Sequence, residues 1–135
     1  MILVDTSMLI DYLKGSENDK VTLFDTLLKQ DQPYGISSYT YLEVLQGSKH
    51  EQEYKTLKEY LSTQTIYYLP ESIETYDKAA NLYFQLRRQG VTPRSVIDIL
   101  ISLTAIEYQL YLLHNDRDFD IIADKTPELK IYPLR

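Results

Sequence analysis

Hydrophobic and polar residues follow two different periods along this chain, and the period changes every few residues. Compact apolar runs of strand length occur at residues 2–5, 34–37, 65–69, 110–115 and 129–134. The intervening segments carry apolar residues every three or four positions, the helical period. These predicted helices span 6–15, 19–30, 38–47, 51–64, 71–90 and 95–109, with a single helical turn at 118–124. Strands alternating with helices predict an α/β fold with a largely parallel sheet.

The turn signals are spread evenly instead of being gathered in a linker. Three predicted helices end at a glycine, namely Gly15, Gly47 and Gly90. The chain has 135 residues and no internal repeat, a length that fits one domain with one core. We therefore expect a single domain over residues 1–135.

Charge and cysteine content narrow the function classes. The chain has no cysteine, which leaves carboxylates and two histidines as metal ligands and indicates a reducing compartment. Its net charge of −6 argues against non-specific nucleic-acid binding, which depends on neutralising phosphates. A nucleic-acid substrate would need divalent metals or a local basic patch, for which Arg87, Arg88 and Arg94 are candidates. No long apolar run or signal segment is visible.

Acidic residues stand at the places where predicted strands end or apolar helices begin. Asp5 and Asp116 follow strands, and Asp98 lies within the apolar stretch "SVIDILISL". Each acid alone has a structural explanation. Asp5 fits the cap of the first helix, and Asp116 or Asp118 fits the cap of the turn after the penultimate strand. Asp98 fits a capping box with Ser95, and Glu43 fits a capping box beginning at Thr40.

The shared placement of the acids is what helix capping leaves unexplained. In open parallel sheets, ligands bind just beyond the carboxyl ends of the strands, where all four acids are expected to converge. Carboxylates at short range do not all ionise without a counter-charge, which hard divalent cations supply. The pattern therefore predicts a site for Mg²⁺ or Mn²⁺.

Three stretches carry a resemblance to a known family. They are "ILVDTSMLIDYLKG", "ISSYTYLEVLQG" and "RRQGVTPRSVIDILISLTAIEYQLYLLHNDRDF". In order and spacing they resemble the PIN-domain ribonucleases, and among these the VapC-like toxins of bacterial and archaeal toxin–antitoxin pairs. The resemblance implies one PIN-like domain, built as an α/β/α sandwich with a central, mostly parallel sheet.

The resemblance also implies a set of site residues. The acidic quartet would be Asp5, Glu43, Asp98 and Asp116, with Asp118 as a further acid. The implied activity is endonucleolytic cleavage of RNA that leaves a 5′-phosphate, with Mg²⁺ or Mn²⁺ as cofactor. We expect Asp5, Asp98 and Asp116 to hold the principal cation. Glu43 and Asp118 are expected to complete a second or substrate-dependent site or to position the water.

Partners are implied by the same resemblance. VapC-like toxins form homodimers and are silenced by a small, DNA-binding, VapB-like antitoxin that lays an amphipathic segment in a groove between helices. The apolar faces of residues 8–13 and 39–46 are candidates for that groove, and ordinary core packing explains them equally well. We therefore expect an RNA substrate, an antitoxin, a homodimer and a cytoplasmic location without membrane attachment.

Several other residues have both a functional and a structural interpretation. Thr6 and Ser7 can contact substrate phosphate or cap a helix. The three arginines can bind phosphate, but Arg87 and Arg88 also lie in the last turn of a predicted helix, where the helix dipole favours cations. Tyr39 and Tyr41 can stack on bases or pack at the edge of the core. For the histidines, we expect His50 to be a surface residue and His114 to be a neutral hydrogen-bond partner. His114 also departs from the family, which usually has Thr or Ser there.

Four alternatives were weighed against the nuclease. A calcium loop beginning at Asp116 needs Gly and Glu where the chain has Ile121 and Pro127, so it is rejected. The "DRD" at 116–118 resembles a Toprim nuclease, which would need a glutamate where Asp5 stands. A phosphoacceptor receiver domain would need paired acids after the first strand and a lysine late in the sheet, and this chain has neither. A catalytically inactive PIN scaffold that binds RNA is the remaining alternative. Transfer, ribosomal and messenger RNA all stay open as targets.

Overall fold

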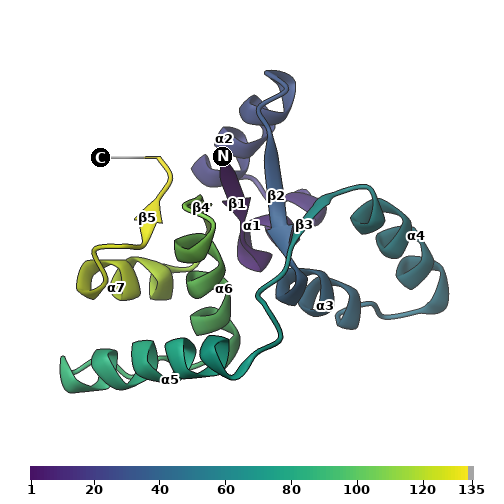
Figure 1. Ribbon diagram of the computed structural model, residues 1–135. Helices are drawn as coiled ribbons and strands as arrows, with labels where there is room; N and C mark the ends of the chain where they lie inside the picture. Colours follow the sequence, from purple (N-terminus) through teal and green to yellow (C-terminus); the bar gives the residue numbers. More distant parts are fainter. Residues whose placement is uncertain (134–135) are drawn as a thin grey trace.

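The computed structural model describes residues 1–133, in which seven helices surround a five-stranded sheet (Figure 1). The strands are β1 (Ile2–Val4), β2 (Tyr34–Ser37), β3 (Thr65–Tyr67), β4 (Tyr111–Leu113) and β5 (Lys130–Ile131). The helices are α1 (Thr6–Leu13), α2 (Asp19–Lys29), α3 (Ser38–Gln46), α4 (Glu51–Ser62), α5 (Ile73–Arg88), α6 (Val96–Glu107) and α7 (Arg117–Lys125). The strand order is β3-β2-β1-β4-β5 and every neighbouring pair is parallel, which confirms the predicted fold class.

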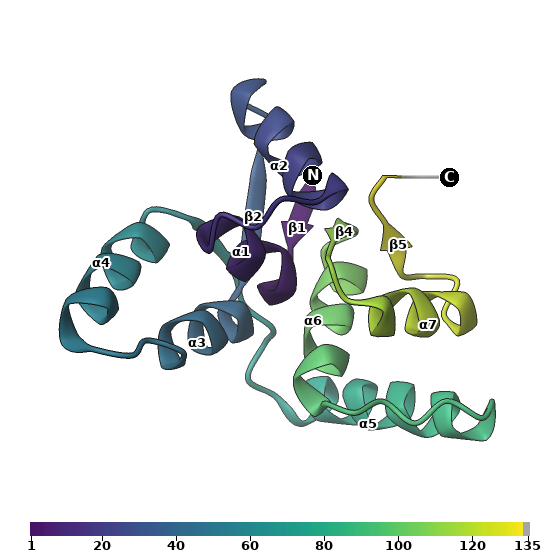
Figure 2. The same ribbon diagram turned by 180° about the vertical axis from the view of Figure 1, so that it is seen from behind.

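The sheet grows outward from β1 in both directions. The chain first builds β1, β2 and β3 towards one edge, then crosses over to place β4 on the other side of β1 and ends at β5. Because parallel crossovers are right-handed, α1 to α4 cover one face of the sheet and α5 to α7 cover the other. In Figure 2 the chain joining α1 to α2 passes in front of β2, whereas Figure 1 shows it behind. The result is the expected sandwich of three layers.

Two hydrophobic clusters fill the space between these layers. Successive residues of a strand point to opposite faces, so Ile2 and Val4 join one cluster and Leu3 joins the other. The first cluster also holds Phe24 of α2, and the second holds Phe119 of α7. The core is therefore divided by the sheet, with β1 contributing to both halves.

Glycine is required at two kinds of position. Gly15 and Gly90 adopt positive φ of 73° and 85° just after α1 and α5, as their predicted role at helix ends requires. Gly35 lies in β2, where a Cβ would come within 2.9 Å of the Thr65 carbonyl oxygen and would also meet the Tyr67 ring. The close approach of β2 and β3 therefore depends on Gly35 having no side chain.

The predicted boundaries differ from the structure mainly near the C-terminus. The strands predicted at 65–69, 110–115 and 129–134 are shorter, and residue 134 lies outside the described residues. The segment expected to form a single turn at 118–124 is the full helix α7. Asp116 caps its first turn, while Phe119 and Ile122 are buried on one face, so capping and packing together extend the helix.

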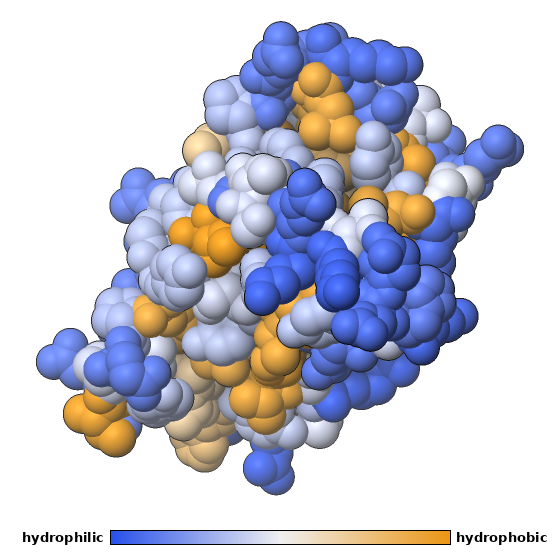
Figure 3. Space-filling view, turned by 90° about the vertical axis from the view of Figure 1, so that its right-hand side faces the viewer, coloured by the Kyte–Doolittle hydropathy of each residue, from blue (hydrophilic) through white to orange (hydrophobic). Residues whose placement is uncertain are grey.

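The surface is mostly polar on the side of the molecule drawn in Figure 3, where apolar side chains form separate small areas. Within residues 1–133, no helix combines the length and apolar character that crossing a bilayer requires.

Candidate active site

The carboxyl ends of β1 and β4 meet at the centre of the sheet. Val4 pairs with Leu113 at the last register position of the two strands, and the Asp5 N–H donates to the Leu113 carbonyl at 2.9 Å. From this point the chain leaves β1 towards one face and β4 towards the other. Such a divergence opens a crevice in which parallel α/β proteins bind ligands, and both Asp5 and Asp116 stand at it.

Asp5 is the N-cap of α1, as one interpretation of the sequence predicted. Its Oδ2 accepts hydrogen bonds from the Ser7 backbone N–H at 2.9 Å and the Ser7 hydroxyl at 2.7 Å. Its Oδ1 is buried and has no hydrogen-bond partner among the described residues. The residue is only 2% exposed, and this burial raises its pKa to about 6. Capping thus uses one oxygen of Asp5 and leaves the other for a ligand.

Asp98 lies in the first turn of α6 and is the electrostatic centre of the acid group. Burial raises its pKa to about 7, helped by the negative charges of Asp5, Asp116, Glu43 and Asp118. The Ser95 hydroxyl caps α6 by accepting from the Ile97 N–H at 3.1 Å. Within residues 1–133, the Asp98 carboxylate makes no return bond to the Ser95 N–H, so the capping-box explanation of Asp98 is wrong.

Asp116 and Asp118 lie at the start of α7 and approach Asp98 directly. Asp116 caps the helix, with its Oδ1 accepting from the Asp118 N–H at 2.9 Å. One carboxylate oxygen from each of Asp98, Asp116 and Asp118 lies within 4.8 Å of the other two. Two elements that are distant in sequence therefore bring three acids to one point.

Glu43 belongs to α3, but its predicted role in a capping box was wrong. The helix begins directly after β2, so its N-cap is Ser37, whose hydroxyl accepts from the Thr40 N–H at 3.0 Å. Glu43 therefore lies a full turn inside the helix. Its Oε1 accepts from the Thr6 hydroxyl at 2.6 Å, which ties α3 to the start of α1.

The hydroxyls of Thr6 and Ser7 hold acids in place. Thr6 donates to Glu43, and Ser7 donates to Asp5. The Ser7 oxygen also accepts from the backbone N–H of Asn115 at 2.9 Å, joining the start of α1 to the segment after β4. Asn115 further donates from its side chain to Asp11 on α1. The role of Asn115 was not predicted from the sequence, where its only signal is its position directly before Asp116.

His114 is buried and both of its ring nitrogens have partners, which explains how it serves in place of Thr or Ser. Nδ1 accepts from the Asp116 N–H at 3.1 Å, so the proton of the neutral ring is on Nε2, 3.1 Å from Asp120 Oδ1. Burial lowers the pKa of His114 and favours this neutral form. His114 is thus a hydrogen-bond partner, as expected, that fixes the turn carrying Asp116. His50 is exposed, as predicted, and caps α4.

Of the three arginines, Arg94 contacts the acid group. Its Nε and Nη2 both donate to Asp118 Oδ2, at 3.0 and 2.7 Å. The Arg88 guanidinium instead lies over the Phe84 ring, 5.8 Å from its centroid, and Arg87 borders an apolar groove between α5 and α6. Within the part of the chain that the structure describes, neither forms an ion pair with an acid of the site.

The two tyrosines near Glu43 are half-buried. Tyr39 packs against the cluster that contains Leu3, and Tyr41 packs against the cluster that contains Val4. Their position is therefore that of residues at the edge of the core, as the structural interpretation predicted, and a stacking role stays untested.

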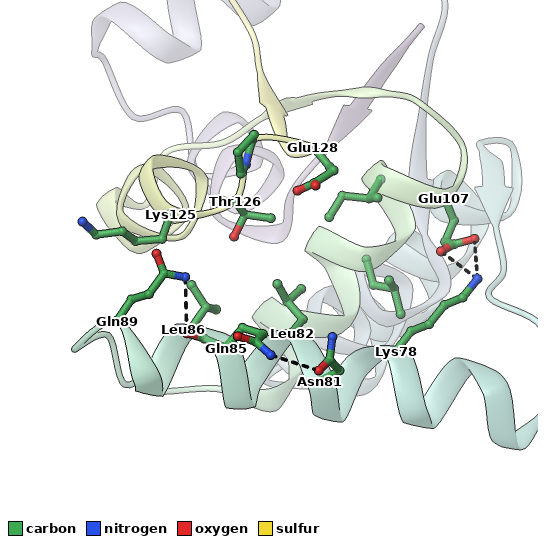
Figure 4. A pocket seen from close by; sticks show the side chains of 13 residues that line it. Lys78, Asn81, Leu82, Gln85, Leu86, Gln89, Glu107, Lys125, Thr126 and Glu128 are labelled. Carbon is green, nitrogen blue, oxygen red and sulfur yellow. Dashed lines mark hydrogen bonds and ion pairs between the residues drawn. The ribbon is translucent and has the colours of Figure 1, made fainter.

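Two hollows on the surface are large enough to be considered as ligand sites. One, of about 190 Å³, opens beside the acids and is lined by Asp98, Asp118, Arg94 and apolar residues that include Val91 and Ile121. The other, of about 410 Å³, lies between α5, the end of α6 and the turn after α7 (Figure 4). Its polar side chains mostly bind one another, as in the ion pair of Lys78 with Glu107, and it contains none of the predicted site residues. The smaller hollow is the one that adjoins reactive groups.

The residues present fit a hard divalent cation. The buried Oδ1 of Asp5 has no hydrogen-bond partner among the described residues, and burial together with the crowded carboxylates raises the pKa of Asp98. A cation bound by oxygens would relieve both conditions. Asp98, Asp116 and Asp118 bring their oxygens close enough together to share a cation, and the charges of Asp5 and Glu43 lie near enough to act on Asp98.

This arrangement of fold and acids is found in a recognised class of proteins. Residues 2–125 match the model of the PIN domain family, and the chain belongs to that family. The family expected from the sequence motifs is thereby confirmed.

Within the family, the chain is most usefully compared with VapC proteins. It is 29% identical over 127 residues to VapC ribonuclease Mb1587 of Mycobacterium bovis and to Ribonuclease VapC11 of Mycobacterium tuberculosis. The match covers 93% of this chain and 94% of each relative.

Several solved structures share the fold. The VapBC2 structure from Rickettsia felis, bound to a promoter DNA fragment, matches with a TM-score of 0.73 at 21% identity, covering 97% of both chains. FitAcB from Neisseria gonorrhoeae matches with 0.70 at 19% identity, covering 98% of this chain and 96% of that one. VapBC-1 from nontypeable Haemophilus influenzae matches with 0.69 at 22% identity, covering 97% and 96%.

Proposed function

We propose that this chain is a metal-dependent endoribonuclease that acts as the toxin of a toxin–antitoxin pair. The observation that carries the proposal is the convergence of Asp98, Asp116 and Asp118, to which Asp5 adds a nearby charge and a buried, unpartnered oxygen. The naming of similar proteins as VapC ribonucleases supports RNA as the substrate.

The acids have distinct roles in this proposal. Asp5, Asp98 and Asp116 bind the principal Mg²⁺ or Mn²⁺, which, when bound, supplies Lewis-acid charge for phosphodiester hydrolysis. Glu43, held by the Thr6 hydroxyl, is oriented to accept a proton from the attacking water or to complete a second cation site. No serine or cysteine nucleophile is required.

Substrate contacts would come from the rim of the acid group. Arg94 presents a fork of N–H donors suited to a phosphate, and the hollow of about 190 Å³ beside it offers apolar surface for a base or ribose. Thr6 and Ser7 already donate to carboxylates, so we propose that they position the acids and do not contact the substrate phosphate directly. Arg87 and Arg88 would lie further along the RNA.

We propose a VapB-like antitoxin as the partner, and burial reduces the number of residues that are candidates for its groove. Met8, Leu9 and Val44 are core residues, so much of the apolar face expected at residues 8–13 and 39–46 is ordinary packing. Leu13 and Leu42 remain exposed, by 39% and 55%. These two side chains are where we place the antitoxin segment. Similar folds in solved complexes with VapB-type partners support such an arrangement.

A homodimer is proposed through the face formed by α5 and α6. That face has a groove of about 540 Å³ lined largely by apolar side chains, among them Tyr76, Phe84 and Val96. Phe84 and Val96 are 55% and 62% exposed, and contiguous exposed apolar surface is typical of interaction sites. Sedimentation velocity should show a dimer for the wild type and a monomer for the Phe84→Asp variant. A wild-type monomer would show that the chain forms no homodimer. A dimer that survives the substitution would show that the interface lies elsewhere.

The deciding experiment is RNA cleavage by the purified, antitoxin-free protein. Total RNA and a panel of defined tRNAs are incubated with Mg²⁺ or Mn²⁺ and compared for wild type, Asp5→Ala, Asp98→Ala and the exposed-acid control Asp77→Asn. We expect metal-dependent cuts with wild type and Asp77→Asn, and loss of cutting with chelator or with either site variant. Circular dichroism checks that all variants are folded.

If wild type, Asp5→Ala and Asp98→Ala behave alike on every RNA, the nuclease proposal is wrong. The chain would then be an RNA-binding or interaction module on a PIN scaffold, in which Asp5 and Asp116 serve as helix caps.

A further inference from the structure

The Arg94 guanidinium places positive charge beside Asp118, one of the acids of the candidate site. Two nitrogens of the guanidinium donate to the same oxygen, Asp118 Oδ2, so that Arg94 makes no hydrogen bond to Asp118 Oδ1. Asp118 is in turn one of the three acids whose oxygens converge. The guanidinium thus supplies positive charge to a cluster of like charges that would otherwise repel one another.

The ion pair between Arg94 and Asp118 has the features of a contact that another ligand can replace. The Arg94 side chain is 77% exposed and stands in the irregular segment between α5 and α6, whereas the Asp118 side chain is only 21% exposed. Ion pairs with an exposed partner contribute little to stability, so a stronger ligand can replace the guanidinium at small cost. A divalent cation bound to carboxylate oxygens is such a ligand.

Once released, Arg94 remains beside the scissile region. It lies four positions before Asp98 in sequence and lines the same hollow as Asp98 and Asp118. A guanidinium binds a phosphate with the same planar fork that it uses for a carboxylate. The released side chain therefore needs only to rotate to meet the backbone of a bound RNA.

We propose that Arg94 is an exchangeable counter-ion, which holds Asp118 in the metal-free protein, is displaced as cations load, and then binds an RNA phosphate. This inference rests on the proposed nuclease function for its second half, whereas its first half concerns metal binding by the protein alone. It makes Arg94 a positioning residue for Asp118 and a substrate contact at successive stages.

The first test measures Mn²⁺ binding to RNA-free protein by isothermal titration calorimetry at low salt. Arg94→Ala should bind Mn²⁺ about three- to tenfold more tightly than wild type, because a competing positive charge is removed. Arg117→Ala is the matched control, since it removes an exposed arginine located between Asp116 and Asp118 in sequence. We expect that control to change the affinity by less than about twofold. In an Asp118→Asn background, Arg94→Ala should have no further effect.

The second test measures steady-state RNA cleavage. Arg94→Ala should raise KM about tenfold, as loss of one charged phosphate contact predicts, although its metal affinity has improved. Arg94→Lys should keep near-wild-type Mn²⁺ affinity with an intermediate KM, because it retains charge and loses the fork.

Opposite changes in metal and RNA affinity are the signature of exchange. Mn²⁺ binding that is weakened by Arg94→Ala, or that responds no more than in Arg117→Ala, overturns the proposal, as does an unchanged KM. If the wild-type protein cuts no RNA under any condition, the proposed function fails, and the Mn²⁺ titrations still decide whether Arg94 is displaced by metal.

Discussion

Asp98→Asn should make the metal-free protein more stable at alkaline pH, although it removes a residue of the candidate site. Burial and the neighbouring acids raise the pKa of Asp98 from 3.8 to about 7. A difference of about 3 in pKa corresponds to about 4 kcal/mol. Asp98 is partly exposed, so solvent screening reduces this to about 2 kcal/mol. Loss of a negative charge near the N-terminus of α6 costs about 0.5 kcal/mol. We expect a net gain of about 1.5 kcal/mol at pH 8.

The gain should depend on pH in a definite direction. Because the folded-state pKa is raised, the folded protein holds a proton on Asp98 between about pH 4 and 7 while the unfolded chain has lost it. The contribution of Asp98 to stability therefore falls as pH rises through this window and is fully unfavourable above pH 7. The advantage of the asparagine variant should shrink steadily towards pH 4.

Urea denaturation in chelator, at pH 8 and at pH 5, measures both effects. Asp77→Asn serves as the control, since it replaces an exposed acid in α5 and should change stability by less than about 0.5 kcal/mol. Adding Mn²⁺ at about 100 times its Kd should then reverse the order, because wild type gains about 2.7 kcal/mol from binding and the variant gains little. An Asp98→Asn protein that is no more stable than wild type at pH 8 would refute the reasoning.

Three further outcomes are expected. Mn²⁺ affinity measured by calorimetry should rise from pH 5.5 to 8, because protons compete for Asp5 and Asp98, with pKa values of about 6 and 7; a flat profile would contradict this. Gly35→Ala should lower the free energy of unfolding in urea by about 2 kcal/mol, because a Cβ meets the Thr65 carbonyl, whereas a neutral result would mean that the strands separate freely. His114→Ala should cost about 1–3 kcal/mol in the same assay by removing the acceptor for the Asp116 N–H, and His114→Asn should restore part of it; equal losses would argue against the acceptor role.

The sequence predicted the fold well because its two hydrophobic periods are distinct. Every predicted helix and strand is present, and the errors lie at element ends, where the pattern is weakest. The helix α7 was underestimated because "DFDIIAD" is short and half acidic, so that only the capping by Asp116 and the burial of Phe119 reveal its length. The hydrophobic pattern does not predict the strand order, because it carries no information on which strands are neighbours.

The acids of the candidate site could be predicted from the sequence, but the contacts that hold them could not. Capping and ligand binding were treated as competing explanations, whereas Asp5 and Asp116 cap helices and still face the acid group. The contacts that orient the acids join residues about 35 to over 100 positions apart, such as Thr6 with Glu43 and Ser7 with Asn115. The first pair depends on how β1 pairs with β2 and the second on how β1 pairs with β4, so no local pattern indicates them.

The sheet is formed by two parts of the chain, β1 to β3 and β4 to β5, which pair where β1 meets β4. The acids are divided between the same two parts of the chain. Everything up to β3 supplies Asp5 and Glu43, and everything from α5 onward supplies Asp98, Asp116 and Asp118. A chain cut between residues 68 and 72 would become two fragments, each with an incomplete set. Fused to two proteins that associate, those fragments would regain a complete set only when brought together, so this fold offers a natural basis for a split-enzyme reporter.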